Sequence, residues 1–126
     1  MIRVTLNDIL NNIEIFKTIS EKILPIKTAY KIARLLRELN HESTLFDESR
    51  HKIIEKYAER TETGEIKMDD NNVSIQPNLI QQCNQELIDL LNTVLEINAN
   101  KISLNDLEDI ELSPSQILSL EPFIEE

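Results

Sequence analysis

The sequence predicts a mainly α-helical protein with minor antiparallel β structure. We expect an elongated helical hairpin with one long helix, plus short strands and a small C-terminal helix. Residues 25–63 form an uninterrupted helical pattern, because they contain no glycine and their only proline, Pro25, stands at the start. Only 4% of the residues are aromatic, so the apolar material is aliphatic and favours packing between helices. Alternation with a period of two is confined to short segments, which predicts short strands.

The N-terminal residues predict a strand followed by a helix. Residues 2–4 alternate in polarity, as expected of a short strand. Thr5 is a good N-cap and Asp8 stands three residues later, where a capping box places an acidic side chain. Apolar residues then follow at helical spacing, and we expect this helix to end near Leu24, because the residue before a proline is disfavoured in the α region.

The long helix is predicted from Pro25 to about Thr63. About 38 residues at 1.5 Å each give a rod roughly 57 Å long, too long to be covered fully by the remaining chain. Gly64, the only glycine, stands where a left-handed C-cap is expected.

One line of apolar residues repeats every seven positions along this helix, which favours contact with another helix. This apolar line comprises Ile32, Leu39, Phe46 and Ile53. The polar stretch 40–44 interrupts the line, and we expect intramolecular cover to end there. An apolar stripe is also typical of an ordinary core, so both alternatives stay open. The residues predicted to bind a partner are Ile32, Leu35, Leu39, Leu45, Phe46 and Ile53.

A short hairpin and a further helix are predicted next. Residues 65–68 and 73–76 alternate on either side of the turn 69–72, with a disordered acidic loop as the alternative. Pro77 then opens a helix with one apolar face. That face comprises Ile80, Cys83, Leu87, Leu90, Leu91 and Val94.

The last third repeats the design of the N-terminus. Residues 102–107 match residues 4–9, and each segment predicts a short strand that passes through a hydroxyl N-cap into a helical turn. Residues 95–97 are a candidate strand partner for both. Residues 113–116 begin a short helix that we expect to end near Pro122.

Charge is distributed unevenly over what we predict to be a single domain, residues 1–126. Residues 1–64 form the helical hairpin with its protruding long helix, and residues 65–126 form an acidic part with short strands and two helices.

Residues 1–60 have a net charge of +2, whereas residues 61–126 have a net charge of −12. An acidic half argues against nucleic acid or an anionic membrane as a partner. Halves of opposite sign could meet between subunits of a homo-oligomer, although a solvated acidic surface is the simpler alternative.

The residue types predict neither an enzyme nor a cofactor or metal site. Cys83 lies on an apolar helix face, as a buried structural thiol does. Asp47, His51 and Glu55 share a helix face and could hold a divalent ion, but the same spacing gives ordinary exposed pairs. One glycine excludes a phosphate-binding glycine loop. A single cysteine, no signal segment and no long apolar run predict a cytosolic protein.

The sequence resembles a family of small siphophage proteins encoded near the tail tape measure protein. The similarity covers most of the chain and lies in helical positions rather than in a catalytic motif. The segments that carry it are residues 24–36 (LPIKTAYKIARLL), 46–50 (FDESR), 53–57 (IIEKY), 102–107 (ISLNDL) and 111–124.

The resemblance implies a tail assembly chaperone in the host cell cytoplasm, because at least one family member is regarded as a tape measure protein chaperone. Such a protein would bind the hydrophobic helical tape measure protein and keep it soluble before the tail tube forms. Two alternatives remain open. One is a structural subunit of the phage particle, and the other is an acidic inhibitor or nucleic-acid mimic that targets a host factor.

Overall fold

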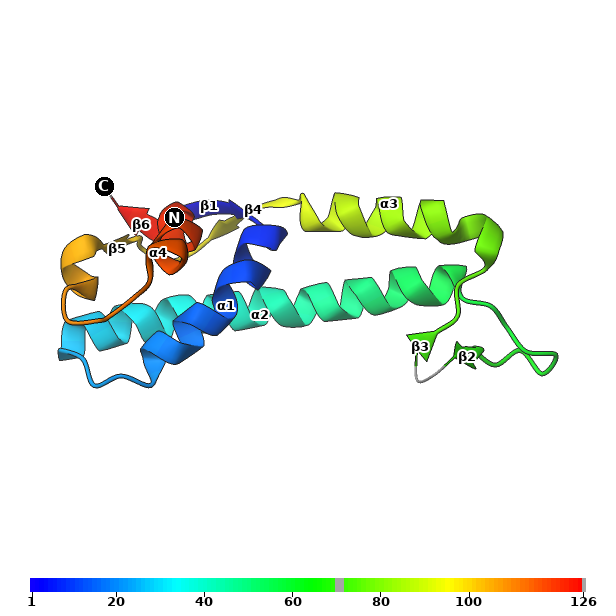
Figure 1. Cartoon of the computed structure of the whole chain (residues 1–126), viewed down its shortest axis with the longest axis horizontal. Coiled ribbons are helices and arrows are strands. Elements are labelled where there is room, and N and C mark those ends of the chain that lie inside the picture. Colours follow the sequence, from blue (N-terminus) through cyan, green and yellow to red (C-terminus); the bar gives the residue numbers. More distant parts are fainter. Residues whose placement is uncertain (70–71, 126) are drawn as a thin grey trace.

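The computed structural model describes residues 1–69 and 72–125 (Figure 1). The helices are α1 (Leu6–Ser20), α2 (Ile26–Tyr57), α3 (Ile80–Leu91) and α4 (Pro114–Leu120). The strands are β1 (Ile2–Thr5), β2 (Met68–Asp69), β3 (Asn72–Val73), β4 (Val94–Ile97), β5 (Ile102–Ser103) and β6 (Ile124–Glu125). The 3-10 turns are η1 (Pro77–Leu79), η2 (Leu104–Leu107) and η3 (Glu121–Phe123). These elements confirm the predicted fold class.

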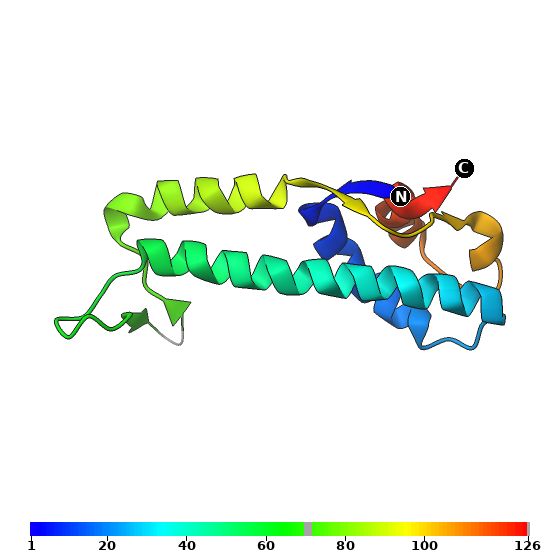
Figure 2. The same cartoon turned by 180° about the vertical axis from the view of Figure 1, so that it is seen from behind.

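The molecule is elongated and has two parts, which Figures 1 and 2 show from opposite sides. We call residues 1–39 and 94–125 the head, and the described residues of 40–93 the arm. The head contains α1, α4, the strands β1, β4, β5 and β6, and the first part of α2. The arm contains the rest of α2, α3 beside it, and the β2–β3 pair at its tip. The head therefore draws on both ends of the chain, so its spatial boundary differs from the predicted division at residue 64.

Two strand pairs organise the head. β1 and β4 are antiparallel, with Ile2 opposite Ile97 and Thr5 opposite Val94, which confirms the predicted pairing of the N-terminal strand with residues 95–97. β5 pairs with β6 instead, and this pair is parallel, with Ile102 opposite Ile124. The second pair was not predicted. It forms because Phe123 is buried in the core, which brings the adjacent residues of β6 alongside β5.

The head core lies between α1, α2 and the strands. One face of α1, including Ile9 and Ile19, packs on α2, and Phe16 meets Phe123 edge to face with ring centroids 5.3 Å apart. Asn12 is buried among these apolar residues, and both polar atoms of its side chain have a hydrogen-bond partner. Its Nδ2 donates to the Asp8 carbonyl at 2.7 Å and its Oδ1 accepts from the Ser119 hydroxyl at 2.7 Å, which joins α1 to α4.

All three predicted capping boxes form. In each, a hydroxyl at the N-cap accepts from the backbone N–H three residues later, whose side chain accepts from the N-cap N–H. A cap of this kind stabilises a helix start by about 1 kcal/mol. The N-cap residues are Thr5 for α1, Ser103 for η2 and Ser113 for α4.

Both N-terminal helices end earlier than predicted. α2 ends at Tyr57 rather than near Thr63, because Ala58 is extended and bridges Ile75 as the chain leaves toward the hairpin. α2 is continuous through residues 40–44 and is about 48 Å long at 1.5 Å per residue.

Gly64 has the expected positive φ of 86°, but in a turn. Its N–H donates to the Thr61 carbonyl at 2.9 Å, beyond the end of α2.

α1 ends at Ser20 rather than near Leu24, because Leu24 packs against the head core as part of the connecting loop.

The predicted hairpin forms at the tip of the arm. Met68 pairs with Val73 and Asp69 with Asn72, in strands of two residues. Part of the predicted turn, residues 70–71, lies outside the described residues. The next helix begins as predicted, with Pro77 in the turn that precedes α3. Val94, expected on that helix, belongs to β4 instead.

Candidate partner-binding surface

The six residues predicted to bind a partner separate into two groups. Ile32, Leu35 and Leu39 are at most 1% exposed and lie in the head core, where α1 packs against them. Their assignment to a partner-binding surface was therefore wrong. An apolar line at seven-residue spacing predicts that a helix covers it, and here α1 of the same chain does so.

The other three residues lie in the arm and remain accessible. Leu45 is 42% exposed, and Phe46 and Ile53 are half-buried. Burial along the apolar line falls after Leu39, but intramolecular cover does not end at residues 40–44 as expected. Phe46 still packs against the head core, and α3 packs beside the second half of α2.

The arm seam is the row of half-buried apolar residues between the second half of α2 and α3. Two helices with a short hairpin at one end form too thin a layer to exclude water from it. The sequence placed Leu87 and Leu90 on one helix face, but it did not reveal that they would face α2. The arm seam comprises Phe46, Ile53, Ile54, Tyr57, Leu87, Leu90 and Leu91.

Along the described part of the arm, two grooves have apolar residues in their lining. The first has a volume of about 440 Å³, an apolar floor of Ile53 and Leu90, and charged walls. The second, of about 350 Å³, lies between α2, α3 and β3 and includes Ile54 and Leu87. The walls of the first groove are Lys52 and Lys56 on α2 with Glu86, Asp89 and Thr93 on or beside α3.

An ion pair links the walls of the first groove. Lys56 Nζ lies 2.9 Å from Glu86 Oε1 and 5.1 Å from the centre of the Tyr57 ring. The hydrogen bond between Lys56 and Glu86 raises the pKa of Lys56 and lowers the pKa of Glu86. Both side chains are partly exposed, although Glu86 Oε2 itself is buried without a hydrogen-bond partner. The pair therefore contributes little to stability and mainly sets the charge pattern along the groove.

Of the candidate chemical groups predicted from the sequence, Cys83 is buried, His51 pairs with Glu55 and Asp47 is exposed. Cys83 is 3% exposed, and burial raises the pKa of its thiol, which disfavours the reactive thiolate. His51 Nε2 lies 2.9 Å from Glu55 Oε1. Within residues 1–69 and 72–125, no three His, Cys, Asp or Glu side chains gather closely enough to hold a metal ion. None of the helices in this part of the chain is both long and apolar enough to cross a membrane.

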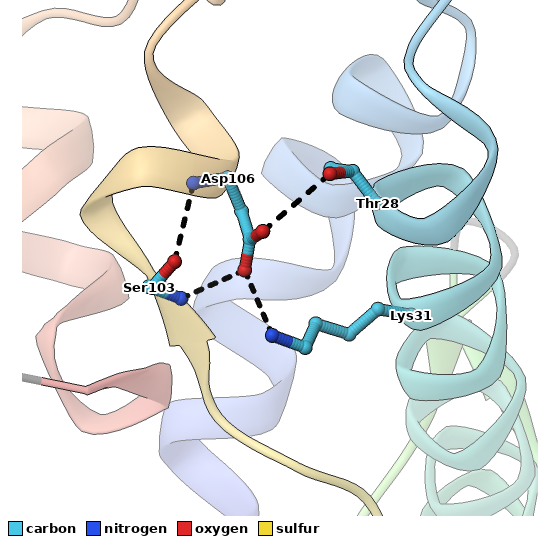
Figure 3. Close-up of polar contacts among 4 residues, drawn as sticks. All are labelled: Thr28, Lys31, Ser103 and Asp106. Carbon is cyan, nitrogen blue, oxygen red and sulfur yellow. Dashed lines mark hydrogen bonds and ion pairs between the residues drawn. The ribbon is translucent and has the colours of Figure 1, made fainter.

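Asp106 is the most connected polar side chain of the head (Figure 3). Its Oδ2 accepts from Lys31 Nζ at 2.8 Å and from the Ser103 N–H at 3.0 Å, and its Oδ1 accepts from the Thr28 hydroxyl at 3.4 Å. These bonds fix η2 against the start of α2. The hydrogen bond from Lys31, joined by those from Ser103, holds the pKa of Asp106 below its usual range although partial burial opposes the shift.

We expect Asp106→Asn to lower the free energy of unfolding at neutral pH by about 2 kcal/mol, the usual size for a hydrogen bond to a charged group. The folded pKa of Asp106 is depressed, so its stabilisation is fully present above the unfolded pKa and is lost as the pH falls through the folded pKa. Urea denaturation at neutral pH and at steps below about pH 4 should therefore show the wild type and the variant converging in acid.

Asp109→Asn is the matched control, because Asp109 is exposed two residues beyond η2. It should change stability little at either pH. A deficit of Asp106→Asn that stays constant with pH would show that the charge of Asp106 does not hold η2.

The fold and this surface define a small helical protein with a packed head and an arm whose apolar seam is half covered. Comparison of the chain with protein-family models, curated proteins and solved structures gives no significant match. A functional proposal therefore rests on the residues of this chain and on the surface they form.

Proposed function

We propose that this protein is a phage tail assembly chaperone that binds the tape measure protein through the arm and keeps it soluble until the tail tube forms. The protein would act in the cytoplasm of the host cell. The observation that carries the proposal is the arm seam, which leaves aliphatic surface open over several helical turns. The resemblance of residues 24–36, 46–50 and 53–57 to small siphophage proteins identifies the proposed client.

A tape measure chain exposes long helices with apolar faces, and an arm groove suits such a ligand. An amphipathic helix can lay its apolar side on Ile53 and Leu90 while the charged walls contact its polar side. The floor of this groove is aliphatic, whereas the tightest interfaces usually have aromatic anchors at the centre. A moderate, spread-out contact of this kind allows the client to leave when the tube assembles.

Coexpression with fragments of the tape measure protein tests the proposal. We expect a soluble complex with an apolar helical fragment, scored by soluble yield and copurification. Ile53→Asp should reduce the copurified client about tenfold or more, because it places a carboxylate on the apolar floor of the groove. Ile88→Asp is the matched control, since Ile88 is 49% exposed on α3 and does not line either groove.

The outcomes separate this function from that of an acidic inhibitor. Unchanged capture by Ile53→Asp, with a normal circular dichroism spectrum, would remove the arm groove as the client site. Neutralising the exposed carboxylates Glu108, Asp109 and Glu111 should leave capture intact. If neutralising these carboxylates abolished inhibition of a host factor, the result would favour an acidic inhibitor instead. Asp106 is left out of this test because it holds the head together.

A further inference from the structure

A second apolar surface lies at the other end of the molecule, where α1 connects to α2. Ile23 is fully exposed, Ile26 is 85% exposed and Tyr30 is 69% exposed. Ile26 and Tyr30 are four residues apart, so they share one face of α2. Lys27 and Arg34 on the same helix are also exposed. We call these five residues the basic knob.

The basic knob is part of the head surface and faces away from the head core. Thr28, Ile32 and Leu35 are buried on the opposite side of α2, toward the head core. Isolated apolar residues on a surface need no explanation, but adjacent large ones mark a contact site. The patch was not predicted, because Ile26 and Tyr30, its two apolar residues on α2, lie off the seven-residue apolar line.

A complementary feature occurs on the C-terminal side of the head. A hollow of about 180 Å³ lies between η2, α4 and η3. Leu104 and Leu118 at its walls are 58% and 69% exposed, and Glu121 supplies a carboxylate. We call this the acidic hollow, and it is lined by Leu104, Ile117, Leu118, Glu121 and Ile124.

The sizes and charges of the two features match. An apolar cavity of about 150 Å³ can hold benzene, so a hollow of this volume can hold the ring of a tyrosine. Tyrosine is among the residues most often found at the centre of protein interfaces. The cations Lys27 and Arg34 beside Tyr30 complement the carboxylate of Glu121 at the hollow.

We propose that the basic knob of one copy of this protein docks into the acidic hollow of a second copy, with Tyr30 seated between Leu104 and Leu118. Both halves of the contact are present on each chain, which is why a second copy is the occupant we infer. The contact joins two different patches, so it produces either a closed assembly in which every hollow is filled or a longer chain of copies. The arm seam stays free for a client in either arrangement.

The test uses the protein alone, so its failure is distinct from a failure to bind the tape measure protein. Sedimentation velocity over a wide range of concentration should show self-association of the wild type. Tyr30→Asp and Leu118→Asp should each weaken it about 30-fold or more, the effect of losing a central contact worth 2 kcal/mol. Val94→Asp is the control, because Val94 is 51% exposed and belongs to neither patch.

Charge reversal tests the pairing itself. Arg34→Glu and Glu121→Arg should each weaken self-association, and the two changes together in one chain should restore it. The proposal would be overturned if the wild type were monomeric at every concentration. It would also be overturned if the Tyr30→Asp variant formed assemblies of the same mass as the wild type. A Tyr30→Asp variant that keeps its mass and loses only client capture would overturn it too, because the basic knob would then bind the client.

Discussion

Leu39→Asp is expected to leave the protein unfolded at room temperature. Leu39 is completely buried where α1 packs on α2, so the variant loses its apolar burial and places an unpaired carboxylate in the head core. Losing a buried leucine side chain costs about 2–5 kcal/mol, and burying the polar group adds several more. That sum reaches the whole stability of a typical small domain, roughly 5–15 kcal/mol.

Leu45→Asp supplies the matched comparison, on the same helix six residues later. Leu45 is 42% exposed, so this variant should fold and lose about 1 kcal/mol or less. Circular dichroism and urea denaturation measure both variants. If Leu39→Asp folded normally and lost only its client, then the apolar line of α2 would be a binding surface along its whole length.

Phe123→Ala should destabilise the head by about 3–5 kcal/mol, the usual effect of truncating a buried phenylalanine. Phe123 is completely buried, and its ring meets Phe16 at an interplanar angle of 87°. The edge-to-face pair accounts for about 0.5–1.5 kcal/mol of the expected loss. The free energy of unfolding from urea titration measures the effect.

Phe46→Ala is the control for truncation of an aromatic side chain that packs against the head core without being fully buried in it. Phe46 is half-buried at the start of the arm, so we expect a loss of about 1–2 kcal/mol, less than at position 123. Equal losses at the two positions would mean that the C-terminal segment does not complete the head core.

The parts of the fold that the sequence revealed are those with local causes. Each capping box lies within four residues, so Thr5, Ser103 and Ser113 marked their helix starts correctly. The long helix was likewise visible because a run of helix-compatible residues follows Pro25. The β1–β4 pair was also anticipated, since both strands alternate in polarity and only a few such segments exist.

The parts that escaped prediction depend on contacts between distant residues. Nothing local to Thr61 ends a helix, and α2 stops at Tyr57 because Ala58 bridges Ile75. The parallel pairing of β5 with β6 likewise follows from the burial of Phe123.

The candidate site divides for the same reason. The apolar line of α2 was visible in the sequence, but which of its residues face α1 and which face α3 depends on the fold. Leu39 and Phe46 occupy equivalent positions on that line, yet one is completely buried and the other half-buried. The spacing of apolar residues shows which face of a helix is apolar. How exposed each of these residues is depends on how many layers of secondary structure pack around that face.

The division of the head between residues 1–39 and 94–125 has a consequence for how the protein emerges during synthesis. The residues of the arm, 40–93, are made between the two portions of the head. At roughly 5–20 residues per second, translation of that segment takes about 3–11 s. During this interval α1 and the start of α2 lack Ile97 and Phe123, which later complete their core. The nascent chain therefore presents unfinished apolar surface for seconds, and a ribosome-associated factor that shields it should raise the yield of folded protein.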